Sequence, residues 1–377
     1  MPIACRQKAK RGTAFCLKEC PANAPDGVFR YHRIAKPEDL PASDERAVDV
    51  AVLDMNHGWP NLGHDSLIHA VLDAACDLIP LFEKTGLHVR ALSHEVRKAP
   101  HAIPEPPGGR FSLYIGTGGP GDLDPYRNDG VHDGAQGLEE DPAWQAPLFG
   151  LFDGILRDER VALLAVCHSF GVMCRWAGVA RAALRGAEKG GKSTGILENL
   201  LTPEALTHPW FRRFSEELPD GRRLRVVENR LFDLLPTSAS FPASILPIGY
   251  ETLGIGGPRG NAVTMLEFAR DREGVMPRIF GVNHHPEIVD RTWQMLILDQ
   301  KRARREVSEQ WYAERAEILT RSYPDENSDQ RLHATSDYTL LGPLRFHLYR
   351  AVRLRAEALG LATDVHEDRV AEAAGVA

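Results

Sequence analysis

Long hydrophobic runs are absent from the sequence, and this limits where we expect the protein to act. No apolar stretch reaches the roughly 18 residues that a membrane-spanning helix needs. The opening segment, MPIACRQKAKRGTAFCLKECP, is basic but lacks the apolar region of a secretory signal. We therefore expect a cytoplasmic protein with no membrane partner.

Positive charge and cysteine are also scarce. The 45 Lys and Arg residues are outnumbered by 52 Asp and Glu residues, so the formal net charge is -7 and nucleic acid is a poor candidate partner. Six cysteines in 377 residues are too few for a disulfide framework. Cys5, Cys16 and Cys20 match no strong zinc spacing, so we expect no metal site and interpret residues 1–46 as a mobile N-terminal arm.

From about residue 47, short apolar β-branched segments alternate with longer segments of helical period, which predicts a parallel α/β fold. The expected strands lie at 48–54, 87–93, 111–116 and 160–166, and the expected helices lie at 64–86, at 142–158 and from about residue 169. Shorter strand-like segments between residues 222 and 283 fit antiparallel additions and a final strand. The acidic, glycine-rich segment 117–141 has no regular period and is expected to be a functional or mobile loop, such as a lid.

Beyond residue 288 the sequence becomes long, charged and helical. One of these segments carries an apolar stripe, made of Leu344, Leu348, Ala351, Val352 and Leu359. We favour a helical cap on the α/β domain, and a subunit interface is the alternative. The predicted division is therefore an arm at 1–46, a domain at 47–295 and a C-terminal helical extension at 296–377.

The stretch AVCHSFGVM, residues 165–173, places a thiol between an apolar strand and a helix of small residues. The partial positive charge of a helix N-terminus favours a thiolate at Cys167. The backbone N–H of His168 would then point to where an oxyanion forms. The alternative is a buried, inert thiol, which is how we interpret Cys76 and Cys174.

Two further strand ends carry polar or glycine residues. In RIFGVNHHPEIVD, Pro286 favours extended backbone, so His285 and Glu287 project to the same side and can act as a base and its orienting carboxylate, while His284 faces away. In YIGTGGPGDLDP, the N–H of Gly119 could be a second oxyanion donor. An ordinary helix start and a plain Gly-Pro turn are the respective alternatives.

Together these stretches resemble the class I glutamine amidotransferases, which combine a glycine-rich GPG-type loop, a Cys elbow and a late HPE. The resemblance covers about residues 47–295, and GVNHHPE is its most specific part. It implies a three-layer α/β/α, flavodoxin-like fold with a mostly parallel sheet. It also implies that Cys167, His285 and Glu287 form a triad that cleaves a side-chain amide through a thioester, with Gly119 and His168 as the oxyanion donors.

The sequence departs from the family pattern around the substrate. Ala165 and Ser169 stand at the two glycine positions of the elbow, Gly171 stands where the family has Gln, and Leu231 stands where the family has His. The substrate pocket has therefore diverged more than the triad, and no substrate-binding residue is predicted. The expected substrate is glutamine or a γ-glutamyl-type amide.

The predicted reaction needs no cofactor. No ammonia-accepting domain is apparent in the sequence, so synthetic use of ammonia would require a separate synthetase partner, and the C-terminal helices could support an oligomer. A non-catalytic binding or regulatory protein on the same fold, or a Cys-dependent acyltransferase or peptidase, are the alternatives.

The segment Gly186 to Ser193, GAEKGGKS, satisfies a phosphate-binding loop formula. Such a loop requires a helix after it, and here a strand-like segment follows, so we expect a glycine loop that does not bind nucleotide.

Overall fold

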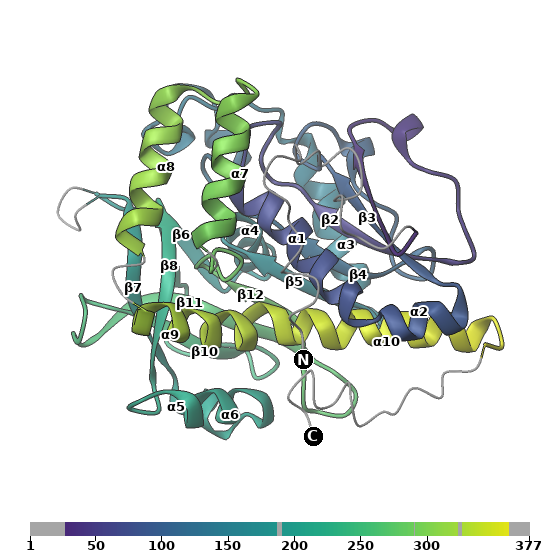
Figure 1. Cartoon of the computed structure of the whole chain (residues 1–377). Helices are drawn as coiled ribbons and strands as arrows, with labels where there is room; N and C mark the ends of the chain where they lie inside the picture. Colours follow the sequence, from purple (N-terminus) through teal and green to yellow (C-terminus); the bar gives the residue numbers. More distant parts are fainter. Residues whose placement is uncertain (1–26, 187–190, 290, 323–325, 362–377) are drawn as a thin grey trace.

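A ten-stranded sheet runs through the computed structural model (Figure 1), which describes residues 27–186, 191–289, 291–322 and 326–361. In spatial order its strands are β1 (Phe29–Ile34), β3 (His88–His94), β2 (Ala47–Leu53), β4 (Phe111–Gly116), β5 (Ala162–Val166), β12 (Pro277–Val282), β11 (Arg259–Arg270), β10 (Leu246–Thr252), β7 (Ser193–Leu201) and β8 (Arg223–Arg230). The first six run parallel, and the remaining neighbours pair antiparallel. The predicted mixed α/β fold with a largely parallel sheet is confirmed.

The first strand of the sheet begins earlier than the sequence pattern predicts. β1 lies at the edge of the sheet and pairs in parallel with β3. Its sequence, FRYHRI, buries only its two ends, so it lacks the apolar run that marks the inner strands β2 and β5. A second, two-stranded sheet joins β6 (Ala180–Leu184) to β9 (Phe232–Pro236).

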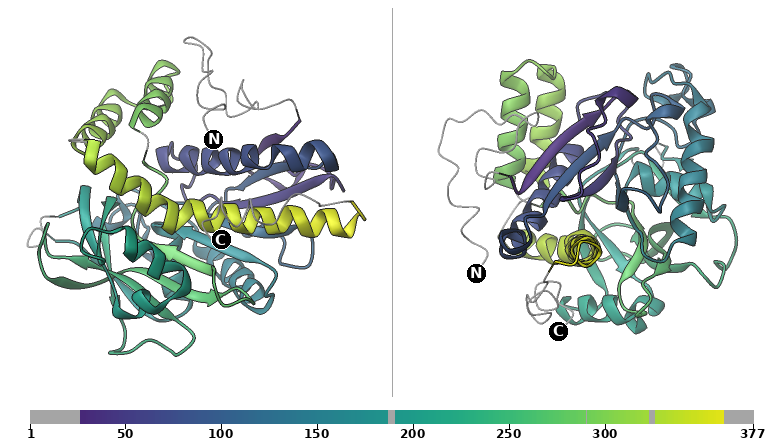
Figure 2. Two further views of the ribbon diagram at one scale, coloured as in Figure 1. Left: turned by 60° about the horizontal axis from the view of Figure 1, so that its bottom comes forward. Right: turned by 90° about the vertical axis from the view of Figure 1, so that its right-hand side faces the viewer.

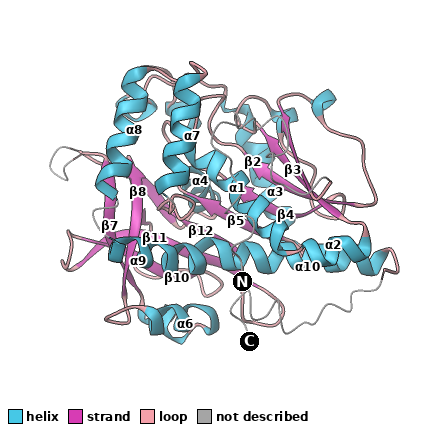
Figure 3. Cartoon of the chain, in the orientation of Figure 1, coloured by secondary structure: helices cyan, strands magenta, loops and turns pink. Residues whose placement is uncertain are grey.

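Helices cover both faces of the large sheet and make three layers (Figure 2). Side chains of β2 alternate between the faces. Val50 and Val52 pack with α1 (Leu62–Asp77) and α10 (Gly342–Ala358), whereas Ala51 and Leu53 pack with α3 (Gln145–Arg157) and α4 (His168–Trp176). The other helices, seen in Figure 3, are α2 (Ile79–Thr85), α5 (Pro203–Thr207), α6 (Pro209–Glu217), α7 (Arg291–Ala303), α8 (Glu309–Ser322) and α9 (Glu326–Ser336).

The single helix predicted at 64–86 is wrong, because α1 and α2 are separate helices. The break falls at Leu78, and Pro80 lies at the start of α2, where a proline without an N–H is tolerated. The predicted stop at Gly86 is confirmed, since this residue closes α2 with φ of +66°.

Helix α10 belongs to one layer of the sheet. It runs beside α1 in both views of Figure 2 and contacts β2, β4, β5 and β12. The predicted apolar stripe faces this core, with Leu344, Leu348, Ala351 and Val352 buried. The structure therefore agrees with the cap interpretation for α10. The domain boundaries at 46 and 295 remain predictions, because the packing draws no line there.

Replacing Leu348 tests the role of α10 as a layer of the fold. The side chain is fully buried, so Leu348→Ala should lower the free energy of unfolding by about 2–5 kcal/mol through lost burial and a cavity. Leu354→Ala is the matched control, because Leu354 on the same helix is 39% exposed. Urea denaturation should separate the two variants, and equal, small effects would contradict the packing of α10 on the sheet.

Candidate active site

Cys167 occupies a sharp turn between β5 and α4. Its φ of +51° and ψ of -103° are rare for a residue other than glycine and cost about 1–3 kcal/mol. The backbone compensates, because the Cys167 N–H donates to the Val282 carbonyl of the neighbouring strand β12 at 2.7 Å. The half-buried side chain lines a cavity of about 350 Å³. As expected, Cys174 is fully buried in α4.

Ser169, at one of the family's glycine positions, closes this turn. Its hydroxyl accepts from the Val166 N–H at 3.0 Å and donates to the Val166 carbonyl at 2.9 Å. Its own N–H donates to the Thr117 carbonyl of the loop after β4. The substitution thus replaces backbone freedom by two side-chain hydrogen bonds.

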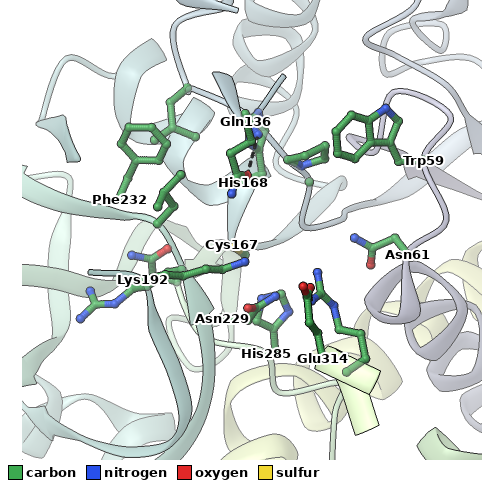
Figure 4. A pocket seen from close by; sticks show the side chains of 18 of the residues that line it. Trp59, Asn61, Gln136, Cys167, His168, Lys192, Asn229, Phe232, His285 and Glu314 are labelled. Carbon is green, nitrogen blue, oxygen red and sulfur yellow. Dashed lines mark hydrogen bonds and ion pairs between the residues drawn. The ribbon is translucent and has the colours of Figure 1, made fainter. Parts of the chain in front are cut away.

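His285 and Glu287 follow β12, the strand beside β5, so chain segments more than a hundred residues apart end at one edge of the sheet. Nδ1 of His285 bonds Oε1 of Glu287 at 2.8 Å, and both side chains are buried. Figure 4 shows His285 beside Cys167. The second ring nitrogen, Nε2, makes no complete hydrogen bond within the described residues, so it is available to the thiol.

The charges of this group decide its protonation. Burial opposes the imidazolium, but the charges of Glu287 and Cys167 outweigh burial and raise the pKa of His285 to about 10. His285 therefore keeps its proton at neutral pH when the thiol is ionised. The Glu287 carboxylate also lies at the N-terminus of α1, where its Oε1 is 2.6 Å from the position that a Cβ of Gly63 would take.

His284 faces away from the site, as the sequence predicts. Its Nε2 lies 3.3 Å from Oγ1 of Thr339, in the turn before α10. Burial, followed by the charges of His285 and Arg230, lowers the pKa of His284 to about 3. This ring is neutral and structural.

The two predicted oxyanion donors, Gly119 and His168, line the same cavity as Cys167. A side chain at position 119 would collide with the Met55 carbonyl, so only glycine fits there. Arg97 holds this loop through Nη1, which donates to the carbonyls of Met55 at 2.8 Å and Pro120 at 2.7 Å. Arg97 is itself paired with buried Glu140, a contact that the sequence did not predict.

The pocket differs from the family pattern at the position of the missing glutamine. A Cβ at Gly171 would collide with the side chain of Leu123, which comes from the loop 117–141 and lines the cavity. The space beside the elbow is therefore filled by an apolar group from another segment. Leu231, at the family's His position, also lines the cavity.

The sequence analysis missed several residues that line the cavity. They are Asn229 and Asn283 at the ends of β8 and β12, Lys192 before β7, and Trp311, Glu314 and Arg315 of α8. Only Lys192 had a signal, as part of the phosphate-loop formula. The formula fails structurally because β7 follows it, although residues 187–190 lie outside the described part.

Two further searches cover only the described residues. No group of three or more His, Cys, Asp or Glu side chains there could hold a metal ion. Cys5, Cys16 and Cys20 lie outside these residues. None of the described helices is long and apolar enough to cross a bilayer.

Comparisons with known proteins give structural likeness only. No protein-family model and no curated protein matches the sequence. Similar solved structures include SMU.1228c, at 14% identity over 82% of this chain and 99% of the other, with a TM-score of 0.39. A provisionally named GMP synthase component from Thermoplasma acidophilum matches at 12% over 64% and 85%, with a TM-score of 0.35.

A provisionally named ThuA-like protein from Parabacteroides merdae ATCC 43184 matches at 11% identity over 63% of this chain and 79% of the other, with a TM-score of 0.30. Likeness at this level assigns no activity to the chain. The functional argument therefore depends on the geometry of the site.

The fit between Gly171 and Leu123 can be tested with a double-mutant cycle. Gly171→Ala should lower the free energy of unfolding by about 1–3 kcal/mol, because its methyl group meets Leu123. Leu123→Ala opens that space, so the double variant should be more stable than the sum of the single effects predicts. Strictly additive effects in chemical denaturation would show that the two residues do not compete for space.

Thiol reactivity tests the pairing of Cys167 with His285. The imidazolium persists until the pH approaches about 10, and its positive charge favours the thiolate. Alkylation of Cys167 by iodoacetamide at about pH 7 should therefore be slower in His285→Gln by on the order of ten-fold. Peptide mass spectrometry distinguishes Cys167 from buried Cys174, which should stay unmodified in the folded protein. Equal rates at Cys167 would contradict the pairing.

Proposed function

We propose that this protein is a cysteine-dependent amide hydrolase of the class I glutamine amidotransferase type. The observation that supports it most is the turn at Cys167, which presents the sulfur beside an imidazole held by a buried carboxylate. A nucleophile, a base and an orienting group arranged in this order are what thioester chemistry requires. A merely structural cysteine would not need a positive φ.

The proposed reaction begins with attack of the Cys167 thiolate on the amide carbonyl carbon. A C–S bond forms, and the oxyanion is stabilised by the N–H groups of Gly119 and His168. When the C–N bond breaks, the imidazolium of His285 gives its Nε2 proton to the leaving nitrogen, and ammonia departs. Neutral His285 then takes a proton from water, whose oxygen attacks the thioester carbon. The C–S bond breaks, and a carboxylic acid and the thiolate are released.

The cavity supports a small polar amide as substrate. Its volume of about 350 Å³ suits a small molecule. Oδ1 of Asn229, Nδ2 of Asn283 and Nε2 of His168 are buried there without a hydrogen-bond partner among the described residues. A polar ligand would satisfy them. Glutamine and γ-glutamyl-type amides remain the proposed substrates. If the ammonia is used, the proposed acceptor is a separate synthetase.

Ammonia release and acyl-enzyme trapping test this proposal. With glutamine and a set of γ-glutamyl amides, Cys167→Ser should lose activity by at least about a thousand-fold, since the nucleophile is gone. Glu287→Gln should lose on the order of a thousand-fold, because its carboxylate orients the imidazole. Cys76→Ser is the control: this thiol lies in α1, is not part of the cavity lining and should leave the rate unchanged.

Mass spectrometry of the quenched reaction should find the acyl group on Cys167. An acyl-Cys167 that transfers to an amine or thiol acceptor, without ammonia release, would support an acyltransferase instead. Absence of both ammonia and any acyl-Cys167 would contradict the proposed function and favour a non-catalytic binding protein.

A further inference from the structure

Helix α8, from the C-terminal part of the chain, forms one wall of the cavity. It packs on β7 and places Trp311, Glu314 and Arg315 against the site, while Lys192 enters from the segment just before β7. Figure 4 shows the Lys192 side chain pointing toward Cys167. The wall thus brings two cations to the cavity that contains the proposed nucleophile.

These two cations lie in an unfavourable environment for positive charge. Burial, together with the charge of Arg315, lowers the pKa of Lys192, and the charges of Cys167 and Glu314 only partly offset this. Burial likewise lowers the pKa of Arg315, with Glu314 opposing. Among the described residues no carboxylate forms an ion pair with Lys192. An anion bound between the two cations would relieve both costs.

The neighbouring charges leave room for that anion. Glu314 is the ion-pair partner of Arg315 at 3.6 Å, but the Glu314 side chain is 53% exposed and the Arg315 side chain only 23%. The carboxylate therefore lies toward solvent, where its charge is screened. Arg230 also lines the cavity, but its guanidinium is already bound to Glu228 and Glu251. Lys192 and Arg315 are the cations free to meet a ligand.

We propose that Lys192 and Arg315 form a carboxylate-binding subsite, so that the enzyme selects amides that also carry a negative charge. The inference rests on the proposed function and adds a substrate class to it. The guanidinium of Arg315 is oriented by the Trp311 ring, 5.1 Å away, and offers a planar fork for a carboxylate, while Lys192 supplies a point charge. Selection thus comes from α8 and Lys192, outside the strand ends that carry the triad.

The charge preference of Cys167 toward alkylating agents tests the subsite without requiring turnover. Iodoacetate carries a carboxylate and iodoacetamide does not, so the ratio of their rates at Cys167 reports the local charge. This ratio should fall by on the order of ten-fold in Lys192→Gln combined with Arg315→Gln, while Arg315→Lys should keep most of it. Arg304→Gln is the matched control, because Arg304 is exposed beside α7 and is absent from the cavity lining. An unchanged ratio in a double variant that melts like the parent would overturn the subsite.

Turnover of three matched amides separates this inference from the proposed function. Glutaramate is anionic, pentanamide is neutral and 5-aminopentanamide is cationic. We expect ammonia release to be fastest from glutaramate, with KM rising at least about ten-fold in the double variant and kcat nearly unchanged. Equal kcat/KM for all three amides would overturn the subsite and leave the hydrolase standing. If no amide is cleaved, the hydrolase fails, and the alkylation ratio still decides the subsite.

Discussion

The charge coupling between Cys167, His285 and Glu287 is the interaction on which the site depends. A buried carboxylate is tolerated only when it is paired, and here it fixes the imidazole that faces the sulfur. The pairing requires β5 and β12 to be parallel neighbours, so that both strands end at the same edge. The Cys167 turn is strained, and the strain is stabilised by the backbone bond to Val282 and by the two hydrogen bonds of Ser169.

Around this fixed centre, the walls of the cavity come from other parts of the chain. Leu123 fills the space beside Gly171, and Arg97 with Glu140 ties the same loop to the body of the protein. Helix α8 closes the opposite side. Because the catalytic strand ends and the cavity walls are separate segments, the walls can change while the proposed chemistry stays. This separation accounts for a pocket that departs from the family pattern around a conventional triad.

The inner strands and the three strand ends could be predicted because buried parallel strands leave a continuous apolar signal. β1 could not, since its edge position leaves FRYHRI half polar, and neither could the break at Leu78, where the apolar stripe continues across Pro80. Sequence reasoning placed Cys167, His285 and Glu287 at strand ends that the fold brings together. The contact of Leu123 with Gly171, and the approach of Arg315 to a cysteine far away in the sequence, depend on tertiary packing and have no local signal.

The protonation of His285 is the most direct test of the central claim. Nuclear magnetic resonance of the protein with isotope-labelled histidine can follow this imidazole as the pH rises, with the His285→Gln variant identifying its signal. If Glu287 and the Cys167 thiolate hold the ring as described, the imidazole stays protonated through neutral pH and titrates near 10. Titration at or below the ordinary histidine value of about 6.5 would contradict the account.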